Sequence, residues 1–66
     1  MKANRTFELR VSRTMVEVLL IADGEIVFFW DVRPDQSRRL AKALRADLAQ
    51  LDKESFLDKW ARWDQS

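Results

Sequence analysis

The hydrophobic period of the chain changes at Pro34. Before this residue, apolar side chains recur at every second position and many of them are β-branched or aromatic, which is typical of β-strands. After it, apolar side chains recur at every third or fourth position, as on one face of an α-helix. A chain of 66 residues has room for only one small core. The sequence therefore predicts a single α+β domain over residues 1–66, with a β half followed by an α half.

Three strands are predicted in the β half, at about residues 6–11, 15–22 and 25–32. The first strand alternates apolar and charged residues, so it has one dry face and one wet face. Asp23-Gly24 lies between the second and third strands and favours a two-residue hairpin with positive φ at both positions. Joined in chain order, the three strands form an antiparallel β-meander.

The second and third predicted strands are largely apolar on both faces, so that one face packs on the core and the other presents surplus apolar surface. An apolar cluster of this kind exceeds what monomers usually expose, and we expect it to meet another surface. The side chains assigned to this protein interface from their alternation along the strands are Leu19, Ile21, Val27 and Phe29.

The α half contains two apolar stripes that point in different directions. A leucine stripe predicts an amphipathic helix at about 34–51 that packs on one face of the sheet, with Pro34 in its first turn. If this helix ran on unbroken, the aromatic residues that follow would project roughly 130° away from the leucines. A break near Asp52 that caps a shorter helix at about 53–63 is the simpler interpretation, with one continuous helix as the alternative.

The shorter helix carries an aromatic stripe formed by Phe56, Trp60 and Trp63. Large aromatic side chains, Trp above all, often dominate the energy of protein interfaces. The stripe therefore predicts a protein interface, either with a partner or with a second copy of the chain. The competing interpretation is that the helix folds back and its aromatic side chains cap the core.

The longer helix carries basic residues on the side opposite its leucines. Arg38, Lys42 and Arg45 are spaced so that they line up on one side, and Arg39 widens this strip. Such a row can contact nucleic-acid phosphates or an acidic partner. It also fits the ordinary solvated face of an amphipathic helix, because charge runs on surface helices are common.

The residue types exclude most catalytic chemistry. The chain has no His, Cys or Tyr, and its single Gly cannot build a phosphate-binding loop. The sequence-adjacent carboxylate pairs, Asp23 with Glu25 and Asp31 with Asp35, bracket a turn and a helix start where Asp is structurally favoured. We therefore expect no enzyme activity, no metal and no cofactor.

A chain this small, without disulfides or thiolate metal sites, depends on self-association for additional stability, so we expect a homodimer. No apolar run is long enough for a signal peptide or a membrane span, and the lack of Cys fits a reducing compartment, which predicts a cytoplasmic protein without membrane partners. The favoured function is a small non-catalytic protein-interaction module, a homodimeric regulatory or inhibitory subunit with a further, unidentified protein partner. The alternative is a nucleic-acid-binding protein that uses the basic helix face.

Overall fold

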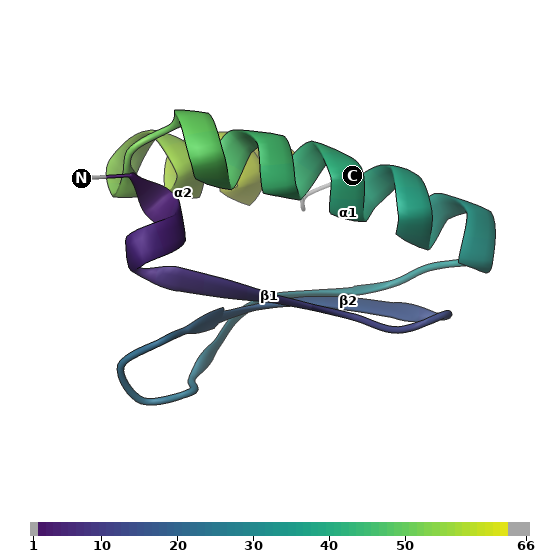
Figure 1. Cartoon of the computed structure of the whole chain (residues 1–66). Helices are drawn as coiled ribbons and strands as arrows, with labels where there is room; N and C mark the ends of the chain where they lie inside the picture. The colour runs from purple at the N-terminus through teal and green to yellow at the C-terminus, as the bar shows by residue number, and fades with distance from the viewer. Residues whose placement is uncertain (1, 64–66) are drawn as a thin grey trace.

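Both helices lie on the same side of a three-stranded sheet (Figure 1). The computed structural model describes residues 2–63, the last of these in its backbone only. This architecture confirms the predicted α+β class and the predicted break between the helices. The elements, in chain order, are η1 (Ala3–Arg5), β1 (Phe7–Val11), β2 (Met15–Leu20), β3 (Ile26–Asp31), α1 (Pro34–Gln50) and α2 (Lys53–Trp63).

The sheet is an antiparallel meander in the order β1-β2-β3, and its second hairpin contains a β-bulge. Val18 faces Phe28 across the hairpin, whereas the next residue of β2, Leu19, faces Ile26. Val27 is therefore an extra residue on β3, and the alternation of side chains shifts there by one position. As a result Val27 packs against the core and Ile26 is exposed, which is the reverse of the assignment made from alternation alone.

The turn between β2 and β3 is longer than the predicted two-residue hairpin. The Leu20 N–H donates to the Glu25 carbonyl, and the Gly24 N–H donates to the Leu20 carbonyl, both at 2.8 Å, so the loop holds residues 21–24. Gly24 has a φ of +76°, and no other described residue has a positive φ, so the predicted type I′ conformation at Asp23 is wrong. The Asp23 carboxylate instead accepts the Glu25 N–H at 2.9 Å, as Asp does in turns of this kind.

The core lies between the sheet and the two helices, and Phe56 of α2 is at its centre with no exposed surface. The Phe56 ring lies 5.4 Å from the ring of Phe7 and 6.4 Å from that of Phe28, measured between centroids. These spacings are typical of favourable aromatic pairs. The buried core consists of Ala3, Phe7, Val16, Val18, Phe28, Trp30, Leu40, Leu44, Leu48, Phe56 and Trp60.

The break between the helices is held by the N-terminal segment and by a cap. The Ala3 N–H donates to the Leu51 carbonyl at 2.8 Å, so η1 is tied to the connection between α1 and α2. The Asp52 carboxylate accepts the Ser55 N–H at 2.8 Å, which caps α2 as predicted. Hydrogen bonds from Ser55, with Lys2 nearby, lower the pKa of Asp52.

The start of α1 is fixed by two side-chain hydrogen bonds. The Gln36 carboxamide oxygen accepts the Arg33 N–H at 3.2 Å, next to Pro34 in the first turn. The Ser37 hydroxyl, which is buried, donates to the Ser12 carbonyl at 2.7 Å. The second bond joins α1 to the turn between β1 and β2 and so positions the basic side chains of the helix against this turn.

Candidate interaction surfaces

The sheet face opposite the helices is bare (Figure 1) and carries exposed apolar side chains. Ile26 and Phe29 are each about half exposed, at 51% and 47%. Leu19 lies between Glu8 and Ile26 in the register and is only 4% exposed, because its cross-strand neighbours flank it. We refer to Leu19, Ile21, Ile26 and Phe29 as the open-face cluster.

The open-face cluster differs from the predicted one at a single position. Val27 was expected on this face but packs against the core, and Ile26 takes its place because of the bulge in β3. Sequence reasoning missed Ile26, since nothing in the local pattern of β3 marks where its pairing with β2 slips by one residue. Ile21 is 54% exposed but belongs to the turn after β2, not to the strand itself.

Polar groups surround this cluster and limit its extent. Glu17 lies in the central strand, directly opposite Arg10 on one side and Phe29 on the other. It is only 6% exposed, since both neighbours flank it. Opposite charges in directly facing positions are favourable in a sheet. The bare face is therefore polar near β1 and apolar near β3.

The outer edge of β3 presents backbone hydrogen-bonding groups. The Val32 N–H donates to the Thr14 carbonyl at 3.0 Å, and these two residues lie opposite each other, so they form a hydrogen-bonded pair. Because such pairs alternate along an antiparallel ladder, the N–H and C=O groups of Phe29 and Asp31 point away from β2. In the described part of the chain, no further strand lies beside β3.

Phe56 and Trp60, two residues of the aromatic stripe of α2, belong to the core. They are 0% and 3% exposed, which agrees with the competing interpretation that this helix folds back and its aromatic side chains cap the core, and not with a protein interface at these two residues. The Trp60 ring meets Trp30 edge-on at 5.8 Å, because α2 folds back along α1 and turns this stripe toward the sheet. The side chain of Trp63, the third predicted interface residue, lies outside the described part of the structure.

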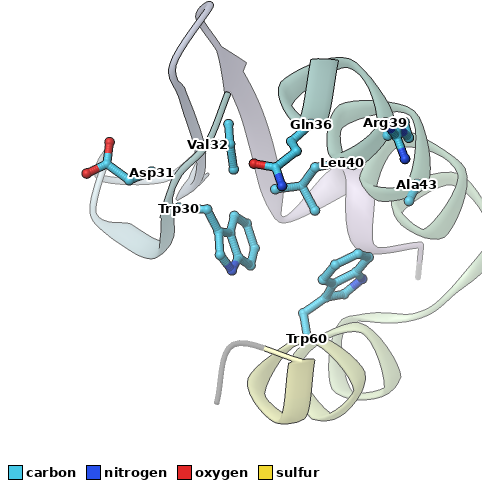
Figure 2. Close-up of a pocket in the computed structure, with 8 residues that line it drawn as sticks. All are labelled: Trp30, Asp31, Val32, Gln36, Arg39, Leu40, Ala43 and Trp60. Carbon is cyan, nitrogen blue, oxygen red and sulfur yellow. The ribbon is translucent and has the colours of Figure 1, made fainter. Parts of the chain in front are cut away.

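A groove of about 450 Å³ opens beside β3 where Trp30 and Trp60 approach each other (Figure 2). Figure 2 shows both indoles and Leu40 lining its inner part, while the side chain of Asp31 points away. Arg39 lies at the outer rim and forms an exposed ion pair with Asp35 at 3.4 Å. The groove is apolar inside, and its position continues the edge of β3.

The predicted basic strip divides between two sides of α1. Arg38 and Arg45 line a second groove of about 440 Å³, whereas Arg39 lies on the other side of the helix. Arg13, from the turn between β1 and β2, joins them. Sequence reasoning missed it because the hydrogen bond from Ser37 that ties this turn to the helix links residues 25 positions apart in the chain. We refer to this recess as the basic groove, lined by Val11, Ser12, Arg13, Pro34, Ser37, Arg38, Ala41 and Arg45.

The arginines that α1 contributes to the basic groove differ from three other helix cations in their partners. Arg39, Lys59 and Arg62 each form an ion pair with a carboxylate of their own or the neighbouring helix. Within residues 2–63, neither Arg38 nor Arg45 has such a pair, and no carboxylate lines the groove. Lys42, the remaining residue of the predicted strip, is exposed on the same helix but does not line the groove.

No group of three or more acidic side chains gathers in a metal-binding arrangement among the described residues. The helices of the described segment are too short or too polar to cross a membrane. Two of the carboxylates considered for catalysis have structural partners. The Asp23 carboxylate accepts a hydrogen bond from the Glu25 N–H within its turn, and Asp35 forms an ion pair with Arg39.

Comparison of the chain with protein-family models, with curated proteins and with solved structures gives no match.

Proposed function

We propose that this chain is a non-catalytic interaction module that associates with a second copy of itself through β3 and the open-face cluster. The observation that carries the proposal is the combination of an edge strand and a bare apolar face at the same border of the sheet. β3 reads Ile-Val-Phe-Phe-Trp-Asp, a six-residue run of strong strand formers with a single charge and neither Gly nor Pro. Exposed edge strands of this composition tend to pair with another strand.

A second copy fits this surface better than an unrelated protein for two reasons. Every copy presents the same edge, and an antiparallel strand pair is self-complementary about a two-fold axis. The chain is also near the lower size limit for independent stability, at which a single core supplies only about 3–5 kcal/mol. Burial of Ile26 and Phe29 between two copies adds apolar contact that the single chain does not have.

Sedimentation equilibrium over a range of protein concentrations around 10 µM tests this proposal, because association depends on concentration. We expect a particle of two chains, each of 7.8 kDa. Phe29→Lys places a charge in the proposed interface and should give single chains. Val11→Lys is the matched control, because Val11 is also an exposed apolar strand residue but lies on β1.

Single chains at all concentrations would refute self-association. If the sedimentation mass of the particle falls equally in both lysine variants, the contact between copies is not specific to β3. Circular dichroism of both variants shows whether each keeps the fold, so that loss of the dimer is separated from unfolding.

The basic groove supports a second candidate function, the binding of a nucleic-acid backbone. Three arginines from two elements surround one recess without a carboxylate among its lining residues, in a chain whose net charge is only +1. Arginine binds phosphate oxygens well because its guanidinium donates several hydrogen bonds in a fixed geometry. No aromatic residue lines the groove for stacking on bases, so any such binding would depend on phosphate contacts and not on sequence.

Fluorescence anisotropy with labelled oligothymidylate tests this candidate. Three phosphate contacts predict an affinity loss of roughly 20-fold between about 50 and 200 mM salt, since the logarithm of affinity falls with a slope of about −0.7 per contact. The double variant Arg38→Glu/Arg45→Glu should abolish binding. The control Arg39→Glu/Arg62→Glu makes the same change in net charge at two exposed, ion-paired arginines outside the groove.

Equal losses in the two double variants would show a response to net charge alone and exclude a groove-specific site. Absence of binding at low salt would exclude the nucleic-acid candidate altogether. If a labelled polyglutamate of equal charge binds as tightly as the oligonucleotide, an acidic protein partner is the better assignment.

A further inference from the structure

The backbone geometry of β3 restricts how two copies can join, and this inference rests on the proposed self-association. The outward-pointing N–H and C=O groups belong to alternate residues, of which Phe29 and Asp31 lie in the regular part of the strand. The next outward position toward the N-terminus falls at the bulge around Val27, where pairing is irregular. A two-fold axis that pairs two copies of β3 must therefore pass close to one of these two residues or between them.

An axis at Asp31 is unfavourable, because it sets two carboxylates directly opposite each other. An axis at Trp30, between the outward residues, sets Phe29 against Asp31 of the second copy and leaves the two carboxylates only about 7 Å apart on the diagonal. An axis at Phe29 sets the two Phe29 residues opposite each other. The Asp31 carboxylates then lie four residues apart along the pair, about 13 Å.

We infer that two copies pair their β3 strands in antiparallel fashion about Phe29, so that the two sheets become one six-stranded sheet. Each Phe29 N–H then donates to the Phe29 carbonyl of the other copy, and the two rings, now 47% exposed, cover each other on the bare face. Ile26 of each copy lies on the same face and extends the apolar surface beside the pair. The helices stay on one side of the combined sheet, as they do in the single chain.

The groove beside Trp30 and Trp60 is consistent with this arrangement. It opens along the border of β3 at residues 30–32 and is apolar inside. In the proposed pairing, Trp30 lies opposite Phe28 of the second copy on the helix side of the sheet. The second copy thus adds aromatic surface along the border where the groove opens.

The chain has no cysteine, which makes this register directly testable. A single introduced cysteine can form a disulfide only with the same cysteine of a second copy. Directly opposed residues of a hydrogen-bonded antiparallel pair have Cα atoms about 5.5 Å apart, which suits a disulfide. Phe29→Cys should therefore form a disulfide-linked dimer under mild oxidation. Ile26→Cys is the matched control, because Ile26 lies on the same strand and face as Phe29 and is similarly exposed. In the proposed pairing, Ile26 of one copy does not lie opposite Ile26 of the other, so this variant should not cross-link.

Asp31→Cys keeps Phe29 in place and should not cross-link to the second copy, because the two Asp31 residues lie about 13 Å apart in the proposed pairing. We expect Phe29→Cys to cross-link about tenfold faster than Asp31→Cys or Ile26→Cys, because disulfides form only between closely opposed Cα atoms. Sedimentation of the reduced Phe29→Cys variant shows whether it still associates, so that loss of the aromatic pair does not decide the result.

The possible failures are distinguishable. If sedimentation shows two chains but Phe29→Cys does not cross-link, self-association stands and the pairing about Phe29 is wrong. Face-to-face stacking of two bare sheets would give this result, because stacked sheets lie about 10 Å apart, beyond disulfide reach. A mixed disulfide between Phe29→Cys and Asp31→Cys would instead place the axis at Trp30. If sedimentation shows single chains only, both proposals fail.

Discussion

Trp60 of α2 donates a hydrogen bond from its indole Nε1 to the Asp47 carboxylate of α1, with a separation of 3.0 Å. The same carboxylate forms an ion pair with Lys59 at 2.6 Å, and the Lys59 ammonium lies 5.6 Å from the Trp60 ring centroid. These contacts join α2 to the last turn of α1. The buried face of the same indole meets the sheet through Trp30, so Trp60 holds three elements together.

Trp60→Phe tests the polar part of this contact, because it keeps a ring in the core and removes the N–H donor. We expect the free energy of unfolding to fall by at least about 1 kcal/mol, because the hydrogen bond is lost and the smaller ring also leaves part of the buried indole volume unfilled. Urea denaturation measures the change. Lys59→Ala is the comparison, since the Lys59 side chain is 55% exposed and an ion pair open to solvent on this side contributes less than about 1 kcal/mol. A Trp60→Phe variant as stable as the parent chain would show that the hydrogen bond contributes nothing.

Phe56→Ala tests the placement of the aromatic stripe in the core. Removing a buried Phe costs about 3–5 kcal/mol, which is the whole stability that a single core of this size supplies. We therefore expect an unfolded chain by circular dichroism and tryptophan fluorescence. Leu57→Ala, at a half-buried neighbouring position, should keep the fold. A Phe56→Ala variant that stays folded but no longer associates would contradict the core placement of Phe56 and support a role in docking.

Asp52 makes the stability of the chain depend on pH in the acid range. The pKa of Asp52 is lowered in the folded chain, chiefly by hydrogen bonds from Ser55, so its contribution is present above the unfolded pKa of about 3.9. This contribution is lost as the pH falls through the lower folded pKa. Asp52→Asn keeps an N-cap acceptor without a titratable group. The difference in urea midpoint between the parent chain and Asp52→Asn should therefore shrink from pH 5 toward pH 3.

A constant difference over this range would show that the Asp52 charge has no role in stability. Asp52→Ala, which removes both the acceptor and the charge, should lower the midpoint at neutral pH more than Asp52→Asn does. Equal midpoints for these two variants at neutral pH would show that the cap hydrogen bond to Ser55 does not stabilise α2.

Gly24→Ala tests the backbone of the second hairpin. No atom lies within 4 Å of the Cβ that this substitution would add, so only the φ of +76° opposes it. The cost of holding an L-residue in this region is roughly 1–2 kcal/mol. Thermal unfolding should show the loss, and Gly24→Asn should lose less, because Asn tolerates positive φ. Equal stabilities of Gly24→Ala and the parent chain would mean that the turn relaxes to another conformation.

Local periodicity is sufficient to locate most elements of this fold. The alternation before Pro34, the leucine stripe after it and the rotation of the apolar stripe at Asp52 all depend on neighbours within a few residues. For this reason the three strands, the two helices and the break between them agree with the structure. The same applies to the buried face of α1, since Leu40, Leu44 and Leu48 are all core residues.

The location of the surfaces depends on contacts between distant residues and could not be predicted in this way. The bulge at Val27 exchanges the faces of Val27 and Ile26, and it arises from the register between β2 and β3, which alternation within one strand does not contain. The return of α2 along α1 buries Phe56 and Trp60, although a stripe of large aromatics has the same local pattern whether it is core or interface.

The grouping of basic side chains in the basic groove could not be predicted from local spacing either. Spacing along α1 groups Arg38, Arg39, Lys42 and Arg45 into one strip, but the hydrogen bond from Ser37 to Ser12 carries Arg13 to one side of the helix. Periodicity is a property of neighbouring residues, and it determines which elements form. Burial, register and charge grouping are properties of residue pairs far apart in the chain, so they follow only from how these elements pack.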